Sequence, residues 1–282
     1  MRILLLSSLL LVLGSFYIRE TKKTSMPVMC HDPNSPIEQF AAFANDPLFR
    51  AAHPAPLPTG TVHQGEMVEF AVEGGDKGHA YLAKAEKPTD KYLLVFQEWW
   101  GLNDYIKNEA DMWGRELGVN VLAIDLYDGK VATTPDEAGK LMKACDPKRA
   151  SAIIEGAAKY AGDKATFRTI GWCFGGGWSL QAAILLKDRV KACVMYYGMA
   201  ENDQEKLKNL SSSVVFIHPT QDKWINDELV NTFDKSMKTA GKKLTVYHYN
   251  ADHAFANPSN ARYNDSAAKA SRAVVYKYLK NK

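Results

Sequence analysis

Short apolar runs alternate with longer amphipathic segments along the chain from residue 62 onward. The apolar runs predict strands at 62–72, 80–83, 92–96, 119–124, 167–170, 192–196, 214–217 and 244–249. Apolar residues at helical spacing predict helices at 104–117, 136–142, 148–160, 176–186, 227–239 and 264–279. This alternation is typical of an α/β fold, so we expect a mostly parallel central sheet flanked by helices on both faces. The first two strands are close enough for a hairpin, which predicts an antiparallel edge.

The first 60 residues follow neither pattern. Residues 1–25 combine Arg2, an apolar run and a polar end, which is the pattern of a secretory signal peptide, although an uncleaved membrane anchor or a later start at Met26 also fits. Residues 26–60 hold seven of the twelve prolines and no sustained apolar period, so we interpret them as a proline-rich irregular arm. One α/β domain is expected at 61–282. The protein is expected to be exported, to the periplasm or the medium, or to stay anchored in a membrane.

Composition and charge fit one globular domain, with 46% hydrophobic and 24% charged residues. The formal net charge of +3 falls to zero without residues 1–25, which carry four basic residues and one acidic residue. The basic footprint of a nucleic-acid-binding protein is therefore absent. The cysteines Cys30, Cys145, Cys173 and Cys193 lack the spacing of a zinc site. An oxidising compartment would permit a disulfide among them, with the pair left open.

A glycine-rich segment lies between the strand at 167–170 and the helix at 176–186. Its core, Gly171-Trp172-Cys173-Phe174-Gly175, has the Gly-x-Cys-x-Gly form of a nucleophile elbow, in which glycines permit a sharp turn from strand to helix. The position of Cys173 at a helix N-terminus favours the thiolate. The alternative is a buried structural cysteine in a glycine-rich turn.

An elbow nucleophile needs an acid and then a histidine later in the chain. Asp222 and His253 both follow predicted strands, where open α/β sheets bind their ligands. His253 would take the proton of Cys173, and Asp222 would fix the tautomer of the imidazole. Asp252 is a weaker candidate because adjacent residues rarely face each other. We interpret the other histidines as structural or as parts of the arm: His31, His53, His63, His79, His218 and His248.

Glu98 follows the strand at 92–96 and is predicted to reach the same edge of the sheet. A carboxylate there would disfavour the thiolate of Cys173, whereas the alternative is an exposed loop glutamate. The backbone N–H groups of Phe174 and Trp99 are the expected oxyanion donors.

With these residues in place, the chain resembles the dienelactone hydrolases, also called carboxymethylenebutenolidases, of the α/β-hydrolase superfamily. The resemblance covers about residues 62–279. It rests on Gln97-Glu98-Trp99-Trp100-Gly101-Leu102-Asn103, Asp125-Leu126-Tyr127, Gly171-Trp172-Cys173-Phe174-Gly175-Gly176, Asp222, and His253-Ala254-Phe255-Ala256-Asn257-Pro258. It implies an α/β-hydrolase fold, a triad of Cys173, Asp222 and His253, a Glu98 that helps activate the cysteine, and no metal or organic cofactor.

The resemblance also implies hydrolysis of a small ester or lactone. Family members that open dienelactone bind its carboxylate with two arginines, and the corresponding places here hold Gly129, beside Lys130, and Asn257. Dienelactone itself is therefore not the expected substrate. Residues expected to line the pocket are Trp100, Tyr127, Lys130, Trp172, Phe255 and Asn257. Alternatives are a general esterase or thioesterase, a catalytically silent binding protein with the same fold, and a redox-active thiol protein. The oligomeric state is left open.

Overall fold

The computed structural model describes residue 32, residues 34–57 and residues 62–282. The described residues all belong to one compact unit. The signal-peptide or anchor prediction for residues 1–25 lies outside the described residues and stays a prediction, as does export. None of the helices in the described part of the chain combines the length and apolar character that a membrane span requires.

The described residues contain eight strands and nine α-helices. The strands are β1 (Glu66–Phe70), β2 (Gly78–Ala83), β3 (Lys91–Phe96), β4 (Asn120–Ile124), β5 (Thr166–Trp172), β6 (Val190–Tyr196), β7 (Ser213–Pro219) and β8 (Leu244–Tyr249). The helices are α1 (Pro36–Ala42), α2 (Pro47–Ala52), α3 (Asp104–Leu117), α4 (Pro135–Ala144), α5 (Pro147–Tyr160), α6 (Phe174–Leu186), α7 (Gln204–Lys208), α8 (Asp227–Thr239) and α9 (Asp265–Lys280). Two single 3₁₀ turns are Phe43–Asn45 and Lys187–Arg189.

All eight strands form one sheet in the order β1-β2-β4-β3-β5-β6-β7-β8. The pairs from β4 to β8 are parallel, and β1 and β2 form the expected antiparallel hairpin. β2 also runs antiparallel to β4. The α/β prediction with a mostly parallel sheet is therefore confirmed. The eight predicted strands all exist, although β1 is shorter than the run at 62–72 because its first residues precede the pairing with β2.

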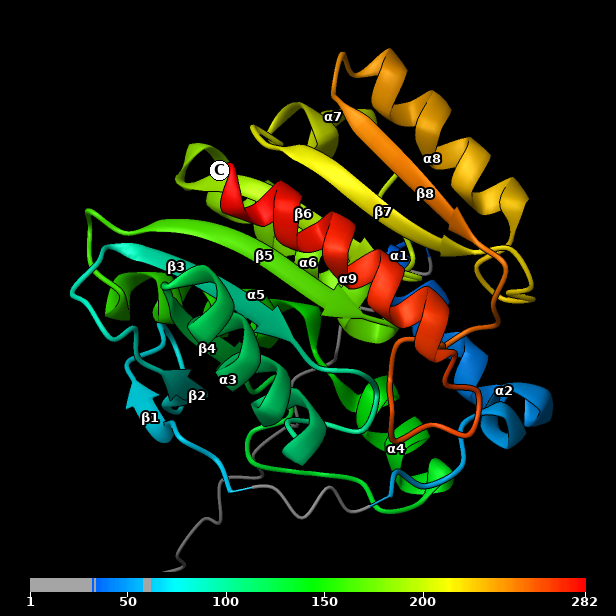
Figure 1. Cartoon of the computed structure of the whole chain (residues 1–282), viewed down its shortest axis with the longest axis horizontal. Coiled ribbons are helices and arrows are strands. Elements are labelled where there is room, and N and C mark those ends of the chain that lie inside the picture. The colour runs from blue at the N-terminus through cyan, green and yellow to red at the C-terminus, as the bar shows by residue number, and fades with distance from the viewer. Residues whose placement is uncertain (1–31, 33, 58–61) are drawn as a thin grey trace, which may run out of the picture. The chain divides into compact units, whose positions relative to one another are not determined.

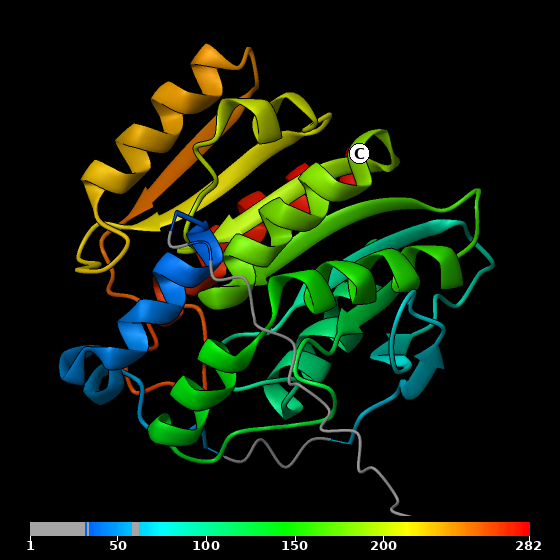
Figure 2. The same ribbon diagram turned by 180° about the vertical axis from the view of Figure 1, so that it is seen from behind.

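Helices cover the sheet on both faces. Figure 1 shows α3 and α9 in front of the sheet, and the view from behind in Figure 2 shows α4, α5 and α6 on the opposite face. α6 is buried over most of its length, since it packs on β5 and β6 and is covered in turn by α1 and α5. This central helix carries the glycine-rich segment at its N-terminus.

Residues 36–52 correct the prediction of an irregular arm, because they form α1, a 3₁₀ turn and α2. Pro36 and Pro47 stand in the first turns of the two helices, where a fixed φ favours helix formation and no N–H is needed. The apolar residues of the segment face the domain: Ile37, Phe40, Ala41, Ala44, Phe49 and Ala52 are buried. Pro36 and Pro47, which were interpreted as part of an irregular segment, therefore stand at the starts of helices. The rest of the predicted arm, apart from residues 32, 34, 35 and 53–57, lies outside the described residues.

The N-terminus of α6 approaches the sheet too closely for side chains. A Cβ built on Gly175 would lie 2.3 Å from the carbonyl oxygen of Phe96 and 2.4 Å from that of Gln97. A Cβ on Gly171 would lie 2.0 Å from the carbonyl oxygen of Gly175. The obstructing atoms are backbone, which cannot rotate away, so glycine is required at both positions.

We predict that Gly175→Ala destabilises the fold by about 1–3 kcal/mol or more, because the new methyl group forces strand and helix apart. The matched control is Gly114→Ala in α3, where the new Cβ would meet side-chain and backbone atoms only at 3.4 Å or beyond. That control should be neutral or stabilising by about 0.5–1 kcal/mol, since alanine favours helix over glycine. Urea unfolding measures both variants. Equal stability of the two variants would contradict the close approach.

Candidate active site

Cys173 lies in the turn between β5 and α6 with φ 58° and ψ −122°, a backbone conformation that a residue with a side chain rarely adopts. The helix begins directly after it, two residues earlier than predicted. The close packing of the glycines around Cys173 maintains this strained conformation. The residue lies in the turn at the carboxyl end of β5. This is the strand, turn and helix arrangement that a nucleophile elbow requires.

Asp222 and His253 come together at the same edge of the sheet. Asp222 follows β7, His253 follows β8, and the His253 Nδ1–H donates to Asp222 Oδ2 at 2.6 Å. The other carboxylate oxygen accepts the backbone N–H groups of Trp224 and Ile225 at 2.9 and 3.0 Å. Burial opposes ionisation of Asp222, but His253 and these donors outweigh it and lower its pKa. The imidazole is thereby fixed with Nδ1 protonated and Nε2 free to accept a proton.

Asp252, the weaker candidate for the acid, has other partners than Asp222. It accepts the backbone N–H of His253 at 2.8 Å, and its other oxygen pairs with the guanidinium of Arg262. The His253 ring is thus oriented by Asp222 and its backbone by Asp252. His218 is held by the carbonyl of Ile225 at 3.0 Å and by His248 at 3.1 Å, away from this pair.

The Cys173 thiol is buried, with 1% of the residue exposed. Burial, followed by the charge of Glu98, raises its pKa well above the ordinary range, while the backbone N–H groups of Phe174 and Trp99 bond to the sulfur and lower it. The helix N-terminus was expected to favour the thiolate, and in this covered state desolvation outweighs that effect. These are the two amides predicted as oxyanion donors, and that role stays a prediction.

Glu98 is buried beside the thiol and accepts a hydrogen bond from the Asn257 side-chain amide at 2.6 Å. Burial raises the pKa of Glu98 to about 7, since the Asn257 amide and the nearby His253 ring compensate only part of the lost hydration. Asn257 is itself fixed, because its oxygen accepts the N–H and O–H of Ser259 at 2.8 and 2.6 Å. The predicted pocket residue Asn257 is thus a partner of Glu98.

An aromatic shell encloses the His253 ring. The ring centroids of five side chains lie 5.0–6.3 Å from it, namely Phe40, Phe49, His53, Tyr197 and Trp224. Three of the five belong to the α1–α2 segment and its end. That segment is tied down by Asp46, which caps α2 and accepts the Trp224 indole N–H at 2.9 Å. The N-terminal helices therefore form one wall of the site.

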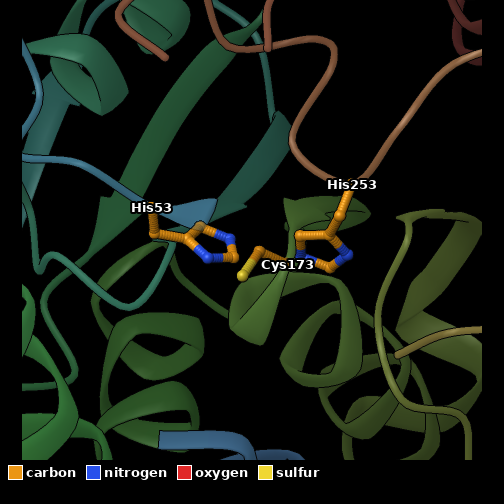
Figure 3. A group of neighbouring side chains, drawn as sticks. All are labelled: His53, Cys173 and His253. Carbon is orange, nitrogen blue, oxygen red and sulfur yellow. The ribbon is translucent and has the colours of Figure 1, made fainter. Parts of the chain in front are cut away.

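His53 is the residue of this wall that sequence analysis missed. It ends α2, is 2% exposed, and donates from Nδ1 to the carbonyl oxygen of Phe49 at 2.7 Å. Figure 3 shows the Cys173 side chain between the rings of His53 and His253. Burial lowers the pKa of His53 to about 3, so the ring is neutral. The available signal was the pair Asp46-Pro47, a capping residue followed by proline, which marks a helix start.

The remaining residues predicted to line the pocket have different surroundings. Tyr127 is buried with its ring 6.2 Å from that of Phe174, and Trp100 packs against Trp99. Phe255 packs behind the site on Tyr197 and Tyr249. Trp172 turns to the other side, where it contacts Tyr105 and Tyr196. Lys130 is exposed.

Cys145, Cys173 and Cys193 carry free thiols. Cys30 lies outside the described residues, so any pairing that involves it stays open.

Comparison with known proteins places this chain in a family. The dienelactone hydrolase family model matches residues 79–282. The chain belongs to the dienelactone hydrolase family. It is a carboxylic ester hydrolase of that family, with the α/β-hydrolase fold. The matched segment includes Cys173, Asp222, His253 and Glu98, whereas α1, α2 and His53 precede it.

Individual relatives agree with this assignment. Protein usf of Aquifex pyrophilus is 31% identical over 205 residues, covering 68% of this chain and 87% of that protein. Carboxymethylenebutenolidase 1 of Cupriavidus pinatubonensis is 21% identical over 226 residues, covering 75% and 95%. Among solved structures, the dienelactone hydrolase-like promiscuous phosphotriesterase P91 from metagenomic libraries superposes with a TM-score of 0.63 at 21% identity, covering 78% of this chain and 99% of that one.

We predict that Glu98→Gln changes stability in a pH-dependent way. The folded state holds the Glu98 proton more tightly than the unfolded chain, so this contribution is fully present below about pH 4.5 and is lost as the pH rises through about 7. The variant should match the parent protein near pH 4.5 and exceed it by up to about 3 kcal/mol at pH 8. Urea unfolding across this range measures the difference.

The control for this measurement is Glu86→Gln, which changes an exposed glutamate in the same way. The free energy of unfolding of this control, relative to the parent protein, should not increase with pH. A constant difference between Glu98→Gln and the parent protein at every pH would mean that folding does not raise the pKa of Glu98.

Proposed function

We propose that this chain hydrolyses a small ester or lactone with Cys173 as the nucleophile, His253 as the base and Asp222 as the group that orients the base. The observation that supports the proposal most strongly is the buried 2.6 Å hydrogen bond between His253 and Asp222 beside an elbow cysteine. A histidine so oriented leaves Nε2 as a proton acceptor on the side of the thiol.

The proposed reaction has two steps. His253 Nε2 takes the thiol proton, the sulfur attacks the carbonyl carbon, and the developing oxyanion accepts hydrogen bonds from the Phe174 and Trp99 amides. The tetrahedral intermediate collapses to a thioester, and the leaving alkoxide takes the proton from His253. A water then gives its proton to His253 and attacks the thioester. The second collapse releases the acid and restores the thiol.

Glu98 would control when the thiolate forms. Its negative charge raises the pKa of the thiol, so protonation of Glu98, whose pKa is about 7, or its displacement by substrate would ease ionisation. The Asn257 amide holds Glu98 without supplying a full positive charge. The cysteine is thus kept protonated until a substrate changes its surroundings.

The substrate that suits this site is a neutral, largely apolar ester or lactone. The shell around His253 consists of Phe40, Phe49, Tyr197, Trp224 and the neutral ring of His53. Arg262 lies 5.9 Å over the Trp224 ring, but its guanidinium is paired with Asp252. A substrate carboxylate would lose its hydration here without gaining a charged partner. Because the thiol and imidazole are covered, binding has to displace part of this shell.

We predict that Cys173→Ala and His253→Ala each lower ester hydrolysis by at least about 10³-fold, and that the double variant is hardly worse than either one, because the two residues act as a unit. Asp222→Asn should cost the same or less, since it misorients the imidazole without removing it. Initial rates with p-nitrophenyl esters measure these losses. Mass spectrometry of a rapidly quenched reaction should detect an acyl group on Cys173.

The matched thiol control is Cys145→Ala, which should keep the parent rate because Cys145 has no part in the proposed triad and its thiol donates to the carbonyl of Leu126. Full activity of Cys173→Ala, or acylation of another residue, would overturn the proposed nucleophile.

We predict that kcat/KM for p-nitrophenyl pentanoate exceeds that for mono-p-nitrophenyl succinate by at least about 10-fold, which corresponds to about 1.4 kcal/mol. The two esters have similar size, and the second carries a carboxylate that the aromatic shell cannot neutralise. Steady-state kinetics of both esters at one ionic strength measure the ratio. A preference for the succinate would show that a cation reaches the site.

A further inference from the structure

Three side chains with metal-binding atoms meet in the covered site. One atom each of His53, Cys173 and His253 lie within 4.8 Å of one another, and all three residues are buried. Two of them belong to the proposed triad, whereas His53 comes from the N-terminal wall and has no part in the proposed hydrolysis.

The hydrogen bonds fix both imidazoles in the form that binds metal ions. His53 donates its Nδ1–H to the carbonyl oxygen of Phe49 at 2.7 Å, and His253 donates its Nδ1–H to Asp222 at 2.6 Å. Each Nε2 therefore carries a lone pair, and neither has a hydrogen-bond partner although both are buried. In metal sites, a ligating histidine almost always donates its other N–H to a carboxylate or a backbone carbonyl, which are the two partners found here.

Packing alone does not explain a histidine at position 53. A buried imidazole nitrogen without a partner costs about 1–3 kcal/mol, and phenylalanine would fill the same aromatic surroundings without that cost. The Phe49 ring lies 4.2 Å from the His53 ring and the Trp99 ring 5.2 Å from it. The lone pair has to be matched by a proton donor or by a cation.

We propose that His53, Cys173 and His253 form a binding site for a divalent ion of the zinc class, and that the bound ion reversibly inhibits the hydrolase. Two neutral imidazoles and a thiolate are ligands that Zn²⁺ prefers. Ligand atoms bound to one ion at about 2.0–2.3 Å lie about 3.4 Å apart. The three atoms are now within 4.8 Å of one another, so they would have to approach by at most about 1.5 Å. Binding releases one proton, that of the Cys173 thiol.

Inhibition follows from the identity of the ligands. The ion would occupy the sulfur that attacks the substrate and the nitrogen that takes the proton, so neither could react. The proposal shares Cys173 and His253 with the proposed function, but metal binding is measured without any turnover. Failure of one proposal is therefore distinguishable from failure of the other.

A second group of candidate ligands provides a control. His218, Asp227 and His248 also lie within 4.8 Å of one another, but two of the three are exposed. His218 Nε2 is already engaged with the carbonyl of Ile225 at 3.0 Å, and its Nδ1 contacts His248. This group lacks a thiol, so an ion bound there has a different spectrum.

The experiment titrates the chelator-treated full chain with Co²⁺, followed by displacement with Zn²⁺. The expected result is one ion per chain, with the near-ultraviolet charge-transfer band of a cobalt-thiolate bond. Cys173→Ser should lose this band, and His53→Phe should bind at least about 100-fold more weakly. His248→Ala should bind like the parent protein. Thermal unfolding checks that His53→Phe is folded, and His53→Gln replaces it if it is not.

Enzyme kinetics test the inhibition. Zn²⁺ should inhibit ester hydrolysis by the parent protein at concentrations near its dissociation constant, as measured by displacement of Co²⁺. For His53→Phe, the Zn²⁺ concentration that halves the variant's own rate should be higher. It should rise by the same factor as the dissociation constant of the variant. The proposal is overturned if the parent protein shows no charge-transfer band, if His53→Phe binds equally well, or if only His248→Ala loses binding. A hydrolase that binds Zn²⁺ here without inhibition would overturn the second half alone.

Discussion

The close approach of α6 to the sheet is the constraint from which the rest of the site follows. The N-terminus of this helix touches the carbonyl groups at the end of β3, and only glycine fits at Gly171 and Gly175. Because the chain has no room to turn gradually, Cys173 takes a strained left-handed conformation and stands clear of the sheet. The Phe174 and Trp99 amides, one from each side of that contact, then point at its sulfur. The position of the Cys173 sulfur, the strain of its backbone and the two amides that bond to it therefore all result from the close approach of α6 to the sheet.

The pKa values of two buried carboxyl groups are shifted in opposite directions by their neighbours. Asp222 has an imidazole and two backbone amides as donors, which lower its pKa despite burial. Glu98 has one side-chain amide, so burial dominates and its pKa rises to about 7. The number of donors, and not the depth of burial, separates a permanent anion from a carboxyl group that titrates near neutrality. The same desolvation keeps the Cys173 thiol protonated, against the helix N-terminus that favours the thiolate.

The sequence predicted the eight strands and six of the nine α-helices of the described residues, because each of these elements has a sustained apolar period. It missed the five-residue α7, as it missed α1 and α2. α3 and α8 have the predicted bounds, since Asn103 and Asn226 cap them. The chain order of Cys173, Asp222 and His253 was accessible for a similar reason, because parallel strands deliver their carboxyl ends to one edge. The hydrogen bond between Glu98 and Asn257 could not be predicted from the sequence, because 159 residues separate the two. A periodic pattern carries no information about a tertiary hydrogen bond.

The N-terminal wall was missed because its helices are too short for a periodic pattern and begin with proline. Helices of six or seven residues are not stable alone, so they depend on tertiary contacts that local sequence does not encode. Here Phe40 and Phe49 pack on the His253 ring, and Asp46 bonds to Trp224 in the loop that carries Asp222. The segment that matches the family begins at residue 79, so it contains the reacting groups but not this wall. His53 adds to this wall a buried lone pair beside the thiol, which hydrophobic packing does not require.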